Sequence, residues 1–100
     1  MAQIRMNPVM VCEDNGFMRT LADVEGAALF MLHQWPRRYR GTKLHIAAQL
    51  AALAAMEGSG VGTPEEFRDA FIEAAGEADI LTSIEKRRVA RISQQRAVKR

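Results

Sequence analysis

The sequence has few of the features that identify a secreted protein or a metalloenzyme. Its single cysteine, Cys12, cannot form an internal disulfide, as is usual for proteins of a reducing compartment. We interpret Cys12 as a small buried hydrophobic residue of the apolar run 9–12 rather than as a reactive thiol. The chain has only two histidines and no cysteine beside them, so it lacks the spaced ligands of a zinc site. We therefore expect no metal and no cofactor.

Motifs of nucleotide binding and of hydrolysis are also absent. There is no P-loop, no G-x-G-x-x-G after a strand and no G-x-S-x-G. Nothing pairs His45 with a nucleophile or an orienting carboxylate, and we interpret it as a structural or surface histidine. No apolar run approaches the roughly 20 residues of a membrane helix, and residues 1–8 lack the apolar centre of a secretory signal. We expect a cytoplasmic protein that is not an enzyme and has no membrane partner.

What the sequence does contain is typical of one small globular domain. Apolar residues make up 48% of the 100 residues and charged residues 26%, which are average values for globular proteins. A core of this size is modest, which favours a partner subunit. The charge is uneven, because the net charge is +6 from Ile84 onward and −4 before it. An acidic body therefore carries a basic tail.

The N-terminal part of the sequence predicts a β-hairpin. Asn15-Gly16 separates two apolar runs, and both residues tolerate the positive φ of a type I′ turn. We expect strands at about 9–13 and 17–22. Neither face of the second strand is wholly apolar, so the pattern does not indicate which of the two faces is buried. Residues 1–7 show no pattern and are predicted to be disordered.

The next segment predicts a central helix that begins after Asp23 and stops at Pro36. Leu29 and Phe30 lie off its apolar stripe, so we expect this helix to contact two neighbours. The stripe follows helical spacing and consists of Val24, Ala27, Ala28, Met31, Leu32 and Trp35.

A second helix is predicted from a Thr42 cap to a Gly58 stop. Ile46, Leu50 and Leu53 line one side of it, and small alanines line the opposite side. We expect each of these two faces to have its own neighbour.

The clearest helix start is Thr63-Pro64-Glu65-Glu66, a capping box with proline at the first helical position. This third helix should run to about Gly76 or Asp79. We predict an α+β fold in which the hairpin packs on a three-helix bundle, in the order β-β-α-α-α, over residues 8–81. A basic, partly helical tail over residues 82–100 is expected to follow.

The order of these signals resembles a family catalogued as domain of unknown function 982. The resemblance rests on the hairpin, the Trp35-Pro36 stop, the alanine-rich helix and the series from Ala70 to Ile80. It covers about Pro8 to Leu81. It implies an intracellular bacterial origin and a shared small fold, and it carries over no catalytic or binding residue.

Two basic clusters are candidate sites for anions or nucleic acid. Bases next to aromatics can hold phosphates and stack on nucleobases, and a basic tail can bind nucleic acid by releasing counterions. Alternatively, the loop is a solvated connection, and the tail docks on the acidic third helix or on a sister subunit, or is merely solvated. The loop cluster is Arg37, Arg38, Arg40 and Lys43, and the tail cluster is Lys86, Arg87, Arg88 and Arg91.

From these features the leading hypothesis is a non-enzymatic interaction or regulatory module that self-associates, as a homodimer for example, or binds a protein partner. The alternative is a nucleic-acid-binding accessory protein that uses the basic tail and the loop from Arg37 to Lys43.

Overall fold

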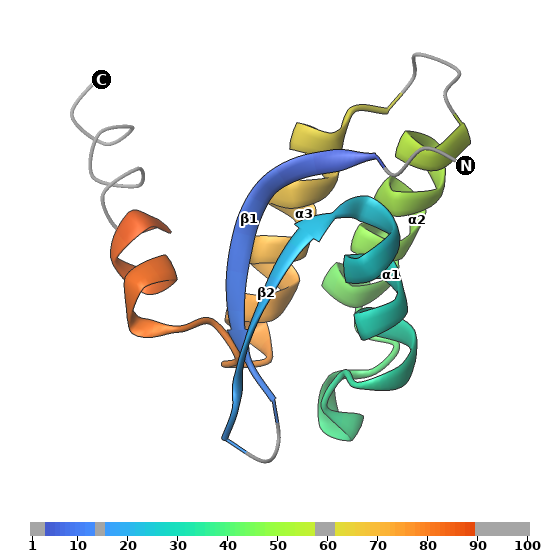
Figure 1. The fold of residues 1–100 in the computed structure, drawn as a ribbon. Coiled ribbons are helices and arrows are strands. Elements are labelled where there is room, and N and C mark those ends of the chain that lie inside the picture. The colour runs from blue at the N-terminus through green and yellow to red at the C-terminus, as the bar shows by residue number, and fades with distance from the viewer. Residues whose placement is uncertain (1–3, 14–15, 58–61, 90–100) are drawn as a thin grey trace, which may run out of the picture.

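The α+β fold and the predicted order of its elements are confirmed in the computed structural model, which describes residues 4–13, 16–57 and 62–89 (Figure 1). Residues 83–89, in the predicted tail, form a helix in addition to the three predicted helices. The elements are β1 (Arg5–Cys12), β2 (Met18–Asp23), α1 (Val24–His33), the 3-10 turn η1 (Arg37–Tyr39), α2 (Lys43–Glu57) and α3 (Pro64–Glu77).

The hairpin is longer than predicted at its N-terminal end. β1 pairs with β2 in antiparallel register, with Val9 opposite Leu21, and the register shifts between Arg5 and Val9. Residues 5–7 therefore belong to the strand, and the prediction that they are disordered is wrong. A bulge interrupts the alternation of apolar residues, and Pro8 lies within it, so the sequence there shows no strand pattern.

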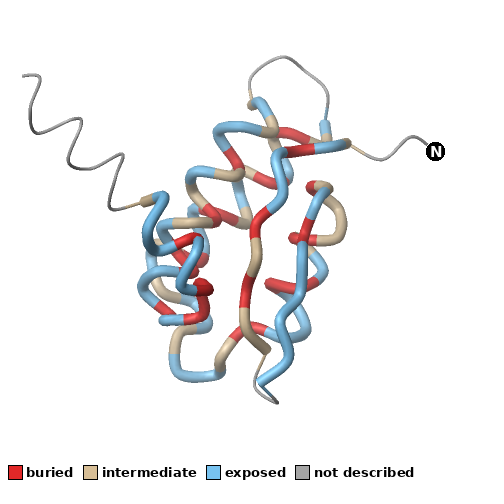
Figure 2. The backbone as a smooth tube through the Cα atoms, turned by 60° about the vertical axis from the view of Figure 1, so that its left-hand side comes forward, coloured by how far each residue is buried: buried red, intermediate tan, exposed pale blue. Residues whose placement is uncertain are grey.

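One face of the hairpin is buried. Val9, Val11 and Leu21 are almost fully buried, whereas most of β2 is exposed (Figure 2). Gly16 has a φ of 86°, the positive value that the predicted turn requires. Asn15, the other predicted turn residue, lies outside the described residues.

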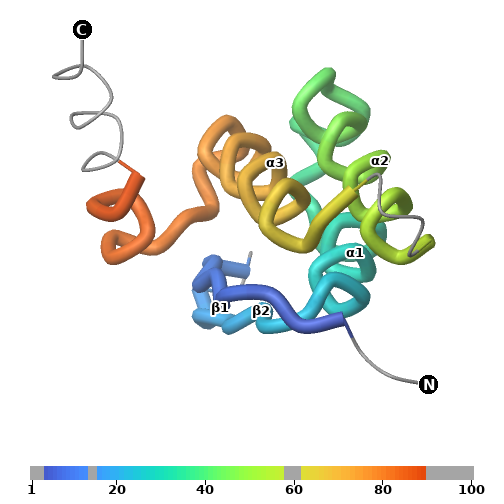
Figure 3. Tube along the Cα trace, turned by 90° about the horizontal axis from the view of Figure 1, so that it is seen from above, coloured from blue at the N-terminus to red at the C-terminus, as the bar shows by residue number. Residues whose placement is uncertain are grey.

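The fold is layered, with α3 over β1 of the hairpin and α2 packed against α3 (Figure 3). α1 follows β2 directly and contacts both β2 and α2. Trp35 lies in the core, 1% exposed, with its ring edge-to-face with the rings of Phe30 and Phe71. This aromatic cluster joins the connection after α1 to α3.

The N-caps predicted for the three helices are present, whereas the predicted Gly58 stop lies outside the described residues. The side chain of Asp23 accepts a hydrogen bond from the amide of Gly26 at the start of α1. Thr42 Oγ1 accepts from the amide of His45 at 3.2 Å, and Thr63 Oγ1 accepts from the amide of Glu66 at 3.1 Å. Each cap satisfies an amide that has no partner inside its helix.

The buried stripe of α1 differs from the predicted one. Phe30 is 2% exposed although it lies off the predicted stripe, and Leu32, which belongs to that stripe, is 56% exposed. The helix also ends at His33, before Trp35. Phe30 and Leu32 are two residues apart and therefore lie on opposite sides of the helix. Because the Phe30 ring packs on Trp35, Leu32 lies outside the core.

Candidate interaction surface

The two faces of α2 have opposite environments. Ala48, Ala52 and Ala55 are buried, each 5% exposed or less. On the other side Leu50 is 60% exposed and Leu53 is 54% exposed. The sequence predicted a neighbour for each face, but the described part of the chain leaves the leucine face open. Alanines allow α2 and α3 to pack closely, because interaxial distance depends on the side chains at the contact.

The exposed face of α2 borders an open groove of about 330 Å³ between α1 and α2. Of the described residues, those that line this groove include no charged residue, and Gln49 is the only polar one among them. Contiguous apolar patches of this kind on a domain mark contact sites more often than chance. We call it the α1–α2 surface, and its residues are Ala28, Leu32, Ile46, Gln49, Leu50, Ala52, Leu53 and Met56.

His45 belongs to the core on the buried side of α2. Its Nδ1 accepts a hydrogen bond from the amide of Gly41 at 3.1 Å, so the ring proton resides on Nε2, which donates to the carbonyl of Met31 at 3.2 Å. The ring lies 5.2 Å from the ring of Trp35. Both nitrogens are used to hold the loop and α1 together, so His45 acts as a structural residue.

The loop cluster predicted to contact anions is partly used by the fold itself. Arg40 Nε donates to the carbonyl of Trp35 at 3.0 Å, close to the C-terminus of α1, where a cation also opposes the helix dipole. The guanidinium of Arg38 lies 5.9 Å from the centre of the Tyr39 ring. Arg37 and Lys43 are exposed.

The tail cluster lies elsewhere on the molecule. Lys86 Nζ is 3.0 Å from Asp79 Oδ1, and Arg88 forms a 3.7 Å ion pair with Glu85. Arg87 is exposed, and Arg91 lies outside the described residues. Residues 83–89 and η1 lie apart in both views (Figures 1 and 3). The fold therefore does not unite the two basic clusters into one site.

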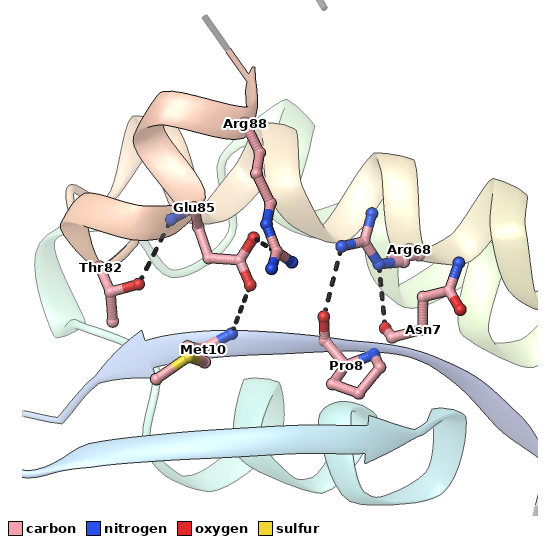
Figure 4. Close-up of polar contacts among 7 residues, drawn as sticks. All are labelled: Asn7, Pro8, Met10, Arg68, Thr82, Glu85 and Arg88. Carbon is pink, nitrogen blue, oxygen red and sulfur yellow. Dashed lines mark hydrogen bonds and ion pairs between the residues drawn. The ribbon is translucent and has the colours of Figure 1, made fainter. Parts of the chain in front are cut away.

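The start of the tail docks on the outer edge of β1, while Lys86 pairs with Asp79, which follows α3. The amide of Cys12 donates to the carbonyl of Ile80 at 2.8 Å, and the amide of Thr82 donates to the carbonyl of Met10 at 3.3 Å. Glu85, only 1% exposed, accepts from the amide of Met10 at 2.9 Å (Figure 4). The buried Glu85 carboxylate thus continues, along the same edge of β1, the hydrogen bonding that residues 80–82 begin.

Arg68 of α3 covers the rest of the same edge. Its guanidinium donates to the carbonyls of Asn7 and Pro8 at 2.9 and 3.3 Å (Figure 4). Sequence reasoning missed the roles of both Arg68 and Glu85. Thr82 and Glu85 have the spacing of a capping box, and Thr82 Oγ1 accepts a hydrogen bond from the amide of Glu85 at 3.4 Å. The Glu85 carboxylate, however, turns to β1, which no local pattern could indicate.

The described residues contain neither a metal site nor a membrane-spanning helix. Among residues 4–13, 16–57 and 62–89, no group of three or more His, Cys, Asp or Glu side chains is placed to hold a metal ion. Within these ranges, no helix has both the length and the apolar character needed to cross a bilayer.

These features define a small α+β domain whose prominent surface feature is apolar and uncharged. A family model described as "Protein of unknown function (DUF982)" matches residues 7–82. The chain belongs to this family, as the resemblance in the sequence indicated. Searches of curated proteins and of solved structures found no match. Most of the basic tail lies outside the matched residues, and bacterial origin and cytoplasmic location stay predictions.

Proposed function

We propose that this protein is a non-enzymatic interaction module that binds another protein chain through the α1–α2 surface. The observation that supports the proposal is the exposure of Leu32, Ile46, Leu50 and Leu53, which are 47–60% exposed around one uncharged groove. Chemistry would require convergent polar groups in a pocket, and this groove is apolar.

The free energy gained by burying this surface is comparable with the cost of association. Fully burying a leucine or isoleucine side chain contributes about 1.5–3 kcal/mol. Covering the exposed half of four such side chains would therefore contribute roughly 3–6 kcal/mol from this chain alone. A partner with a similar surface would double that sum. Association costs about 4–15 kcal/mol in lost freedom, so a complementary partner can offset it.

Site-specific photo-crosslinking in the native cells tests the proposal. A photoreactive phenylalanine analogue replaces Leu53 in the full-length chain, and mass spectrometry identifies the adducts. The matched control carries the analogue at Ile84, which is 49% exposed and lies on the 83–89 helix. We expect a discrete adduct, to another protein or to a second copy, from position 53 and not from position 84. Absence of any such adduct from position 53 would contradict the proposal.

The nucleic-acid alternative makes a different prediction. Binding of the purified chain to duplex DNA would fall steeply with salt, because each phosphate contact releases counterions. It would be lost with the basic tail and would be unaffected by Leu50→Lys. The separation of the two basic clusters weighs against the version that uses both of them. Binding with these properties, without an adduct from position 53, would replace our proposal.

A further inference from the structure

The exposed side of α2 has the residue spacing of a coiled-coil seam. Residues Lys43, Ile46, Leu50, Leu53 and Glu57 are all exposed. They are spaced alternately three and four apart, which is the spacing of the a and d positions of heptads. Such residues form one straight row along a helix and pack into the side chains of a facing helix. The row has apolar residues in its middle and one charge of opposite sign at each end.

We infer that a second copy of this chain occupies the α1–α2 surface, with the two α2 helices antiparallel about a two-fold axis near Leu50. The inference rests on the proposed function and names the partner. Closed two-fold dimers are the commonest oligomers, and they bury the same patch of both copies. The surface must then be complementary to itself.

The charges at the ends of the seam select the antiparallel orientation. Lys43 and Glu57 lie at equal distances in sequence on either side of Leu50. A two-fold axis at Leu50 therefore places Lys43 near Glu57 of the partner subunit, twice in each dimer. A parallel pair would instead bring lysine to lysine and glutamate to glutamate, which is unfavourable. Antiparallel helices also align their dipoles favourably.

The groove gives the seam of the second copy a place to pack. Leu32 and Ala28 of α1 form one wall of the groove and Leu53 of α2 belongs to the other. With the axis at Leu50, Leu50 faces its own copy, and Ile46 of one copy lies within about one residue of the level of Leu53 of the partner subunit. Apolar side chains of the two copies therefore meet each other in the middle of the seam.

The dimensions of this surface indicate a weak dimer. The 15 residues of α2 span about 22 Å, and two neighbouring helices are roughly 20 Å wide. The face of each copy is therefore on the order of 400 Å², or roughly 800 Å² for the pair, which is below the roughly 1,000 Å² of a stable interface and corresponds to a weak, reversible dimer. A strongly charged partner is disfavoured, since the described lining of the groove between Lys43 and Glu57 offers no charge to compensate the partner's lost hydration.

Sedimentation of the full-length chain between about 1 and 100 μM tests the inference, because we expect an interface of this small size to have a dissociation constant in the micromolar range. We expect a monomer–dimer equilibrium for the wild type. Leu50→Lys should raise the dissociation constant by about a hundredfold or more, because it buries two facing ammonium groups. Ile84→Lys, the same change at another half-exposed apolar position, should leave it unchanged. Circular dichroism verifies that both variants are folded.

Charge reversal tests the orientation. Lys43→Glu and Glu57→Lys should each raise the dissociation constant by roughly tenfold, since each replaces two opposite-charge contacts with like-charge contacts. The double variant, Lys43→Glu with Glu57→Lys, should return it to the wild-type value. A double variant as weak as the single ones would overturn the antiparallel arrangement.

The two proposals fail in distinguishable ways. A wild-type chain that is monomeric at 100 μM would overturn the dimer. If position 53 then still crosslinks to a different protein, the interaction module stands with another partner. If the basic residues 90–100 cover the groove instead, their deletion would increase self-association, and the wild type would be monomeric. That result would also overturn the dimer.

Discussion

Both faces of α2 consist mainly of apolar residues, yet only one of them lies in the core. The buried face carries alanines and His45, and the exposed face carries Ile46, Leu50 and Leu53. A scale of hydrophobicity would choose the opposite face for the interior. The difference teaches that close approach of two helices, which small side chains permit, can outweigh the transfer energy of larger ones within a single fold. The leucines are then available for contact with another molecule.

A second comparison supports the same conclusion. The outer edge of β1 is covered by the chain itself, through Arg68, residues 80–82 and Glu85. Unprotected edges invite pairing with other chains, and here that route to association is closed at β1. The α1–α2 surface has no such cover among the described residues.

The largest effect should follow from changing the polar residue of the buried face. His45→Ala removes a buried ring and leaves the Gly41 amide and the Met31 carbonyl without their partner. We expect the free energy of unfolding to fall by about 3 kcal/mol, measured by urea denaturation. His33→Ala, at an exposed site on α1, should change it by less than about 0.5 kcal/mol. Equal effects of the two changes would contradict the structural role of His45.

Replacing alanine with leucine distinguishes the buried face of α2 from its exposed face. Ala48→Leu inserts bulk on the buried side of α2, at a residue that is 0% exposed and does not line the groove, and should lower the free energy of unfolding by about 2 kcal/mol. Ala47→Leu is the same change at an exposed position of the same helix, and it should be nearly neutral. Thermal denaturation of both variants at low concentration provides the measurement. If Ala47→Leu proved the more damaging, the assignment of the buried face would be wrong.

A change at the outer edge of β1 should have a smaller effect on the free energy of unfolding. Glu85→Ala leaves the Met10 amide without its acceptor and should cost about 1–2 kcal/mol. Hydrogen exchange at that amide should accelerate, and a Glu85→Gln variant should retain part of the protection because its side-chain carbonyl can still accept. Glu73→Ala, an exposed acid on α3, is the control. Unchanged exchange at Met10 in Glu85→Ala would refute the contact.

The smallest effect on folding is expected at the exposed face. Leu50→Ala should change the stability of the monomer by less than about 0.5 kcal/mol, because surface substitutions rarely do more. At high concentration the wild type should become more stable than this variant, since association stabilises the folded state by mass action. Denaturation at two protein concentrations measures both quantities. A concentration-independent gap between the two chains would argue that Leu50 contributes to the monomer core.

Much of the fold was predictable, because its signals are local. Gly16 after Asn15 indicated the hairpin, and Asp23, Thr42 and Thr63 indicated the helix starts, through interactions that span a few residues. The extension of β1 was not predictable, because a bulge at Pro8 interrupts the alternation. Of the candidate site, the row of Ile46, Leu50 and Leu53 was visible in the sequence, but its exposure was not.

The sequence by itself determined where helices and strands begin, which residues cap them and that basic charge gathers after Ile84. These properties depend on neighbours along the chain. Only the tertiary structure decided that the alanine face of α2 meets α3, that Phe30 replaces Leu32 in the core and that Glu85 closes the edge of β1. Each of these depends on which distant segment of the chain comes into contact, and the short-range periodicity of the sequence does not indicate which segment that is.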